Sequence, residues 1–144
     1  MLPRWHILLG VIFTFVIWFF APYTRWEYLA LVFLASFLID FDHYINAVIK
    51  SKKLSLFQAF HYHRKLQEKE IQEYKKGIRN KGDFHLFHTI EFQFVIGVIG
   101  IFWAPFFYIF IGMIFHSLID LCYSLYKDRL YRRNYFLFDW IRHI

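Results

Sequence analysis

The sequence predicts an all-α integral membrane protein: a four-transmembrane-helix bundle with a cytoplasmic amphipathic helix, in one membrane domain over residues 1–144. Three observations support this prediction. The chain is 58% hydrophobic and 24% aromatic, with 20 Phe and a mean hydropathy of +0.34, which is unlike ordinary soluble domains. Four apolar runs are each long enough to cross a bilayer. The basic residues gather on one side of these runs.

The four runs follow one another along the chain and are predicted to be helices. The predicted spans are residues 5–21, 26–49, 85–103 and 106–126. A helix rises about 1.5 Å per residue, so runs of this length match the ~30 Å of bilayer hydrocarbon. The first run ends before Pro22, and Ala104-Pro105 forms the tight link between the last two. Proline at these ends leaves every predicted helix interior unbroken.

The distribution of the 17 Lys and Arg predicts the orientation in the membrane. Arg25 lies in the link between the first two runs, and the others lie near the N-terminus, between residues 50 and 81, or after residue 126. Basic loops remain on the cytoplasmic side, so both termini and the long loop are expected there. Nucleic acid is not expected as a partner, because no recognition motif accompanies the charge. Cys122 is the single cysteine, which excludes an intrachain disulfide and a thiolate metal motif.

Two cytoplasmic segments are predicted to lie at the membrane surface. Over residues 55–79, Ser55 and Gln58 have the spacing of a helix N-cap pair, and apolar residues then follow among Lys, Arg and Glu. This pattern predicts an amphipathic helix against the membrane or over the mouth of the bundle. The tail, residues 127–144, is basic and aromatic and is expected at the same interface, with membrane lipids as partners.

Ionisable residues of the types that bind metals lie inside or at the ends of the apolar runs. Each such group near the centre of a span costs roughly 2.5–3.5 kcal/mol, so several of them mark a functional site. With the predicted topology, they fall at similar depths near the cytoplasmic side. We therefore predict that they form one metal site. The candidate ligands are His6, Asp40, Asp42, His43, His85, His88, Glu91, His116 and Asp120.

Helical spacing supports this convergence, because residues three or four apart share a helix face. Asp40 and His43 are so related, as are His88 and Glu91, whereas Asp42 points away from Asp40 and either supports a ligand or binds another ion. Imidazole with carboxylate and no thiolate suits zinc first, then manganese or iron, and the number of candidates allows one to three ions. Hydrogen bonding between helices is the alternative role for such residues. Participation of His61 and His63, on the amphipathic segment, stays open.

The ordered motifs resemble those of the predicted membrane-bound metal-dependent hydrolases, the LexA-binding inner-membrane type. The segment Ile39-Asp40-Phe41-Asp42-His43 is similar to the family's Pro-Asp-x-Asp-His motif, with Ile39 in place of the proline. Gly112, His116 and Asp120 match a Gly-x-x-x-His-x-x-x-Asp element, and His6 matches an early His on the first span. The family's His-Arg-Gly-x-Thr-His-Ser is shortened here to His85-Leu86-Phe87-His88-Thr89, which leaves the role of His85 open.

The resemblance implies a function as well as a location. The family is distantly similar to zinc phospholipase C and single-strand-specific nucleases, so it implies a hydrolase in the inner membrane of a bacterium or archaeon. Its expected substrate is a phosphoester of a lipid or lipid-linked molecule at the cytoplasmic side, with Asp120 or Glu91 as proton acceptor. The residues also allow two alternatives: a metal-ion or proton transporter using the same cluster, and a non-catalytic metal- or haem-binding membrane protein.

Overall fold

A computed structural model describes residues 3–142, and within this range the chain is all-α, as predicted. The helices are α1 (Pro3–Phe20), α2 (Trp26–Leu38), α3 (Phe41–Ser51), α4 (Leu56–Lys75), α5 (Ile90–Phe102), α6 (Ala104–Tyr126) and α7 (Leu137–Arg142). Two 3-10 turns, η1 (Leu86–His88) and η2 (Leu130–Arg132), lie between them. The last two residues of the predicted interfacial tail, 143–144, lie outside the described residues.

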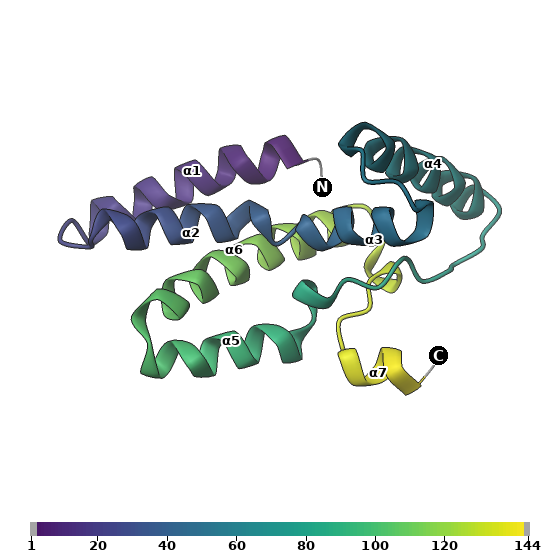
Figure 1. The fold of residues 1–144 in the computed structure, drawn as a ribbon. Helices are drawn as coiled ribbons and strands as arrows, with labels where there is room; N and C mark the ends of the chain where they lie inside the picture. Colours follow the sequence, from purple (N-terminus) through teal and green to yellow (C-terminus); the bar gives the residue numbers. More distant parts are fainter. Residues whose placement is uncertain (1–2, 143–144) are drawn as a thin grey trace.

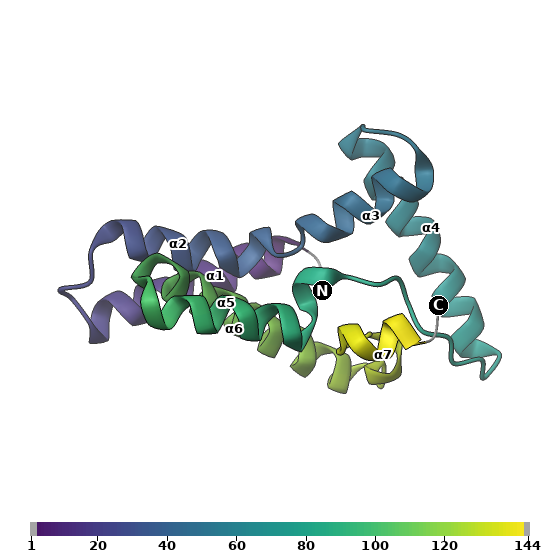
Figure 2. The same cartoon turned by 60° about the horizontal axis from the view of Figure 1, so that its bottom comes forward.

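Helices α1, α2, α5 and α6 form a bundle, while α3, α4 and α7 lie at one end of it (Figure 1). Helix α2 packs against both α1 and α6, and α5 packs against α6 on another side. Helix α4 projects from that end and contacts α3 (Figure 2). The arrangement agrees with the predicted order of four apolar helices and one separate amphipathic helix.

Close approach of α6 to α2 depends on Gly112. A Cβ atom added at Gly112 would collide with the backbone oxygen of Val32 and would lie 2.8 Å from the Cβ of Ala35. Real Cβ atoms do not approach other atoms so closely, so only glycine allows these two helices to pack at this distance. Gly112 lies one turn before His116, and the contact therefore fixes that histidine relative to α2.

The predicted second span does not form one regular helix. Helix α2 ends at Leu38, α3 begins at Phe41, and Asp40 lies in the break between them. The predicted third span also begins later than expected, because residues 86–88 form η1 and the α-helix starts at Ile90. Both irregularities occur where polar residues interrupt the apolar sequence.

Only part of the predicted set of four spans has the required length within residues 3–142. The segments Trp26–Ser51 and Ala104–Tyr126 are long and apolar enough to cross a membrane. Arg4–Phe20 and Ile90–Phe102 are apolar but shorter. The 13 residues of α5 extend only about 20 Å at 1.5 Å per residue, less than the hydrocarbon thickness. The prediction of four full spans is therefore supported by two segments, and by length and composition alone.

Candidate metal centre

Four of the predicted ligands meet in the interior. Asp40, His88, His116 and Asp120 each offer one ligand atom, and these four atoms all lie within 4.8 Å of one another. His116 Nε2 lies 3.2 Å from both His88 Nε2 and Asp120 Oδ2. Asp40 Oδ1 lies 3.4 Å from the Nε2 atoms of His88 and His116. We call these four residues the central group.

The irregular backbone positions two members of the central group. Asp40 lies between α2 and α3, and His88 ends η1, so neither occupies the interior of a regular helix. His116 and Asp120, in contrast, are four residues apart on α6 and share its inner face, as helical spacing predicts. The segments that supply the group are thus separated by tens of residues in sequence.

His6 lies beside the central group. Its imidazole ring is fully buried and stacks on the ring of His116, with centroids 4.0 Å apart and an angle of 18° between the planes. Its Nε2 lies 3.2 Å from Asp120 Oδ1, yet neither ring nitrogen of His6 makes a hydrogen bond of good geometry to the part of the chain that the structure describes. A buried imidazole in this state is an available ligand, since buried polar atoms normally have a partner.

A second set of candidate ligand residues includes His88 and lies beside its imidazole ring. Asp42, His43 and His88 also offer ligand atoms within 4.8 Å of one another. Asp42 Oδ2 lies 3.0 Å from His88 Nδ1 and accepts a hydrogen bond from the backbone N–H of Phe87. Asp40 and Asp42 therefore lie at opposite nitrogens of the same ring, which agrees with the expectation that they point in different directions.

His85 and the two histidines of α4 have different environments. His85 Nδ1 lies 3.7 Å from Asp42 Oδ1 and 3.1 Å from Asn46 Nδ2, at the edge of the second set. His63 Nε2 is 3.0 Å from the backbone oxygen of His43, so His63 contacts the edge of the site through the backbone. His61 is exposed and belongs to neither set of ligand atoms.

Glu91 is not brought to either set. Its carboxylate accepts hydrogen bonds from the backbone N–H groups of Leu137 and Phe138, at 2.9 and 3.4 Å, and so holds the start of α7. Glu91 and His88 do not share a helix face as expected. His88 belongs to η1, whereas Glu91 belongs to the separate helix α5, which Thr89 caps. The structure gives Glu91 a position in the anchoring of α7 instead.

Two partners of the central group carry no clear signal in the sequence. Arg133 Nη2 lies 2.6 Å from Asp120 Oδ2, which brings one cation of the tail to the buried carboxylate. His116 Nδ1 is 2.8 Å from the backbone oxygen of Ser36, which directs Nε2 toward the central group. Arg133 is one of several basic tail residues, and a backbone oxygen leaves no trace in residue type, so neither could have been predicted.

Burial defines what the central group can do. His116 is fully buried, His88 and Asp120 are 4% and 3% exposed, and Asp40 is the most accessible member. Buried carboxylates need a compensating cation, and Arg133 supplies one charge for the two carboxylates of the group. Mixed imidazole and carboxylate ligands suit zinc, and also manganese or iron. These residues therefore form a buried cluster that could hold a metal ion.

The loop that leads to His85 is held by an ion pair at the surface. Lys50 Nζ lies 2.6 Å from Asp83 Oδ1, and the Tyr62 hydroxyl donates a hydrogen bond to Asp83 Oδ2 at 2.9 Å. Burial alone would raise the pKa of Asp83, but hydrogen bonds from Lys50 and Tyr62 outweigh it, and the pKa is lowered. The loop is thereby fixed to α3 and α4.

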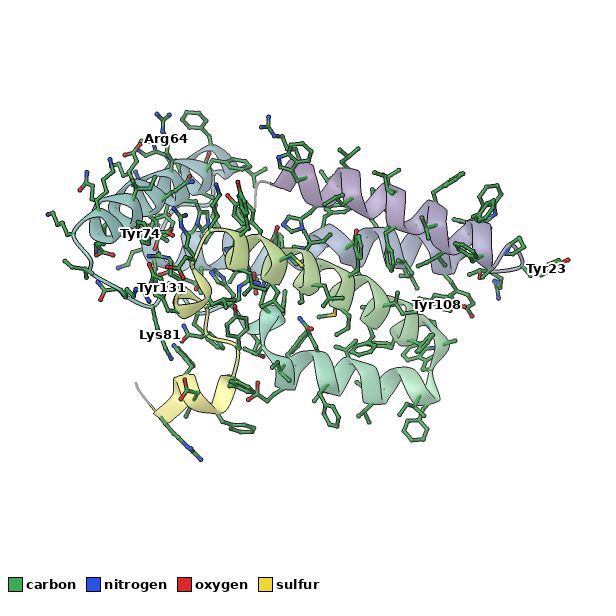
Figure 3. The ribbon with its side chains drawn as sticks, turned by 180° about the vertical axis from the view of Figure 1, so that it is seen from behind. Tyr23, Arg64, Tyr74, Lys81, Tyr108 and Tyr131 are labelled. Atoms are coloured by element: carbon green, nitrogen blue, oxygen red, sulfur yellow. The ribbon has the colours of Figure 1, made fainter. Side chains whose placement is uncertain are left out.

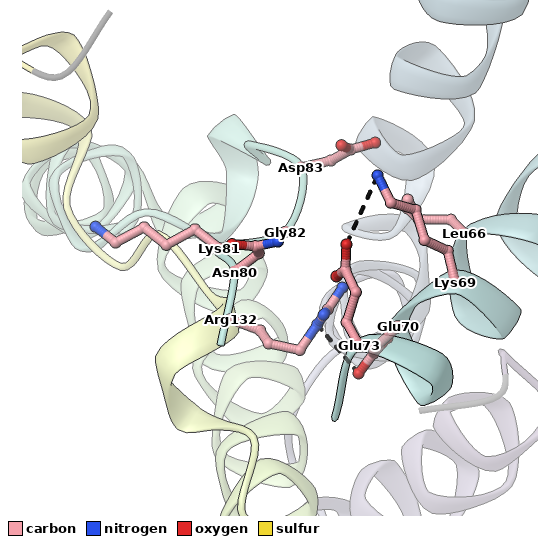
Figure 4. Close-up of a pocket in the computed structure, with 9 residues that line it drawn as sticks. All are labelled: Leu66, Lys69, Glu70, Glu73, Asn80, Lys81, Gly82, Asp83 and Arg132. Carbon is pink, nitrogen blue, oxygen red and sulfur yellow. Dashed lines mark ion pairs between the residues drawn. The ribbon is translucent and has the colours of Figure 1, made fainter. Parts of the chain in front are cut away.

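A polar pocket of about 250 Å³ lies beside this loop, between α4 and η2 (Figure 4). Glu70 pairs with Arg132 at 3.0 Å, and Lys69 pairs with Glu73 at 3.7 Å. The pair between Glu70 and Arg132 holds α4 against the tail segment that carries Arg133. The pocket is thus part of the scaffold that places the arginine, and it lies apart from the ligand atoms of the central group.

Comparison with known protein families, with curated proteins and with solved structures finds no match. The geometry therefore identifies an all-helical protein with a buried His/Asp cluster that could hold a metal, and it identifies no family.

Proposed function

We propose that this protein is a membrane-bound metal-dependent hydrolase that cleaves a phosphoester of a lipid or lipid-linked substrate at the cytoplasmic side. The observation that carries the proposal is the central group, in which four ligand atoms from separate segments lie within 4.8 Å of one another. The hydrolytic reaction is proposed because the motifs around Asp40 and His116 resemble those of the membrane-bound metal-dependent hydrolases. Zinc is the metal we expect, because it favours mixed imidazole and carboxylate ligands.

The surface of the bundle supports insertion into a membrane. In each of the two long apolar segments, only 22% of an 18-residue apolar stretch is buried inside the protein. Large side chains such as Phe94, Ile101 and Phe102 are 69–87% exposed on α5. Apolar surface of this extent needs lipid or another protein to cover it. Lipid is the cover that accounts for all of these helices together.

The polar end of the molecule supports the proposed orientation. Figure 3 shows Arg64, Tyr74, Lys81 and Tyr131 at the end that carries α4, whereas Tyr23 lies at the opposite end of the bundle. The basic loop and tail belong to the α4 end, and basic segments favour the cytoplasmic side. The central group then lies toward the cytoplasmic end, within reach of lipid headgroups.

The proposed reaction would use the residues of the central group together with Arg133. A metal ion bound there would supply Lewis acidity and a water of lowered pKa. With such an ion bound, a water oxygen would attack phosphorus as the bond from phosphorus to the leaving oxygen breaks. Asp120 would be the candidate carboxylate to take the proton of that water and pass it to the leaving oxygen. Arg133, which pairs with Asp120, would neutralise negative charge on the phosphoryl oxygens.

The alternatives account for the cluster less well. Glu91 no longer serves as a candidate proton acceptor, because its carboxylate holds α7. A haem held between two histidines fits poorly, since the rings of His6 and His116 stack directly on each other. Transport is disfavoured by the sequence of the bundle, because α5 carries no acidic, basic or histidine residue after Glu91, and α6 carries none before His116. Hydrolysis therefore accounts for the cluster best.

Metal analysis of the purified protein tests this proposal. We expect bound zinc in the protein extracted in detergent, and loss of the metal in His116→Ala and Asp40→Asn. His61→Ala is the matched control, because His61 is exposed and lies outside both ligand sets. Hydrolysis of phosphatidic acid or a phosphodiester in vesicles should be lost in the same two variants. Metal-free protein, or hydrolysis that survives both variants, would overturn the proposal.

A further inference from the structure

An apolar groove runs along the bundle beside the central group. Helices α2 and α5 both pack on α6 and are separated from each other over its surface (Figure 1). The space between them is a groove of about 340 Å³, within the ~300–1,000 Å³ typical of ligand pockets. Its lining is apolar throughout and includes Leu31, Ile39, Phe87, Ile96, Ile109 and Met113.

One end of the groove adjoins the candidate metal centre. Ile39 precedes Asp40, Phe87 precedes His88, and Met113 lies one helical turn before His116. In two segments a lining residue is adjacent in sequence to a central-group residue, and in α6 it lies one turn away. One end of the groove therefore lies next to the segments that carry the central group.

The groove extends from the central group along the helix axes. Leu31 precedes Asp40 by nine residues, and Ile109 precedes His116 by seven. At about 1.5 Å per residue, the groove reaches roughly 10–14 Å from the polar end. In the proposed orientation this direction runs from the cytoplasmic headgroups toward the middle of the bilayer, parallel to lipid chains.

We propose that this groove binds one hydrocarbon chain of the substrate while the central group and Arg133 hold its phosphate. This inference rests on the proposed function, because it takes the central group as the headgroup site. A linear alkyl chain fits an apolar groove aligned with the bilayer normal, and its charged end would lie at the histidines and Arg133. The ligand is thus a single-chain or double-chain amphiphile with a phosphate at its head.

Photolabelling in vesicles tests the chain site. The probe is a long-chain alkyl phosphate with a diazirine near the end of its chain, in phosphatidylcholine vesicles containing the purified protein. We expect labels on groove residues such as Leu31, Ile96 and Ile109. Ile96→Trp should reduce this labelling roughly tenfold, the effect of excluding about two methylene groups from an apolar site. Val95→Trp, on the exposed face of α5, is the control and should label normally.

The outcomes separate the chain site from the metal centre when zinc is measured in the same samples. Labels spread evenly over the exposed faces of the helices, unchanged by Ile96→Trp, would overturn the groove proposal even if zinc is bound. Groove labelling that Ile96→Trp removes, in protein that binds no zinc, would support the chain site and overturn the metal-dependent function. A Tm equal to that of the wild-type protein shows that the Ile96→Trp variant is folded, whether or not zinc is bound.

Discussion

Arg133 Nη2 lies 2.6 Å from Asp120 Oδ2, so a residue of the tail neutralises a carboxylate that is only 3% exposed. The tail is held in place by backbone hydrogen bonds from Gly82 N–H to the Arg132 oxygen and from Ile90 N–H to the Tyr135 oxygen. The segment after α6 therefore returns to the bundle and contributes directly to the candidate metal centre.

Arg133→Gln should destabilise the metal-free protein. Removing one partner of a buried ion pair costs about 3–5 kcal/mol, and the partial exposure of Arg133 places the expected loss at the lower end. Zinc should restore part of the loss, because a bound cation also neutralises Asp120. Thermal unfolding in detergent, with and without zinc, measures both effects. Arg142→Gln, at an exposed position, is the control, and equal stability of the two variants would contradict the assignment.

Removal of metal should lower the stability of the wild-type protein. A ligand at 100 times its Kd stabilises the folded state by about 2.7 kcal/mol, so chelation should lower the Tm and added zinc should restore it. The double variant Asp40→Asn/His116→Ala should show no response to zinc, since two of the four ligand atoms are lost. A zinc response of wild-type size in this variant would place the ion elsewhere.

Asp42→Asn tests how the second set contributes. Asp42 Oδ2 lies 3.0 Å from His88 Nδ1, so we expect Asp42 to orient His88 for an ion in the central group. Loss of such a partner lowers metal affinity about 10–100-fold and leaves the stoichiometry unchanged. Zinc titration measures both quantities, with the exposed Glu68→Gln as the control. A fall from two ions to one would show instead that the second set binds its own metal.

The helices could be predicted from the sequence, because apolar runs bounded by proline and charge have a physical cause that is local. The pairing of His116 with Asp120 was predictable for the same reason, since four residues bring side chains to one helix face. The break at Asp40 and the 3-10 turn at His88 were not predictable. In both places tertiary packing determines the backbone conformation. Regular helical spacing therefore predicted that Glu91 lies beside His88, whereas its carboxylate contacts the start of α7.

Gly112→Ala should be far more disruptive than Gly97→Ala. A Cβ at position 112 meets the backbone oxygen of Val32, which cannot move without shifting α2, whereas a Cβ at position 97 meets only the ring of Phe110. Overpacking costs about 1–3 kcal/mol, and we expect the upper part of this range for Gly112→Ala. Zinc affinity should fall as well, because Gly112 lies one turn from His116. Thermal unfolding and zinc titration of both variants check this order.

The contact of Asp83 with Lys50 and Tyr62 should stabilise the loop before His85 in a pH-dependent manner. The folded-state pKa of Asp83 is lowered, so its contribution is present above the unfolded value of about 3.9 and is lost as the pH falls through the lowered pKa. Asp83→Asn should therefore speed proteolysis or amide exchange of this loop at pH 7, and the difference from wild type should shrink below about pH 4. Glu68→Gln, which removes an exposed ion pair on α4, should leave the loop unchanged. A difference between wild type and Asp83→Asn that is constant over this pH range would show that the ion pair does not hold the loop.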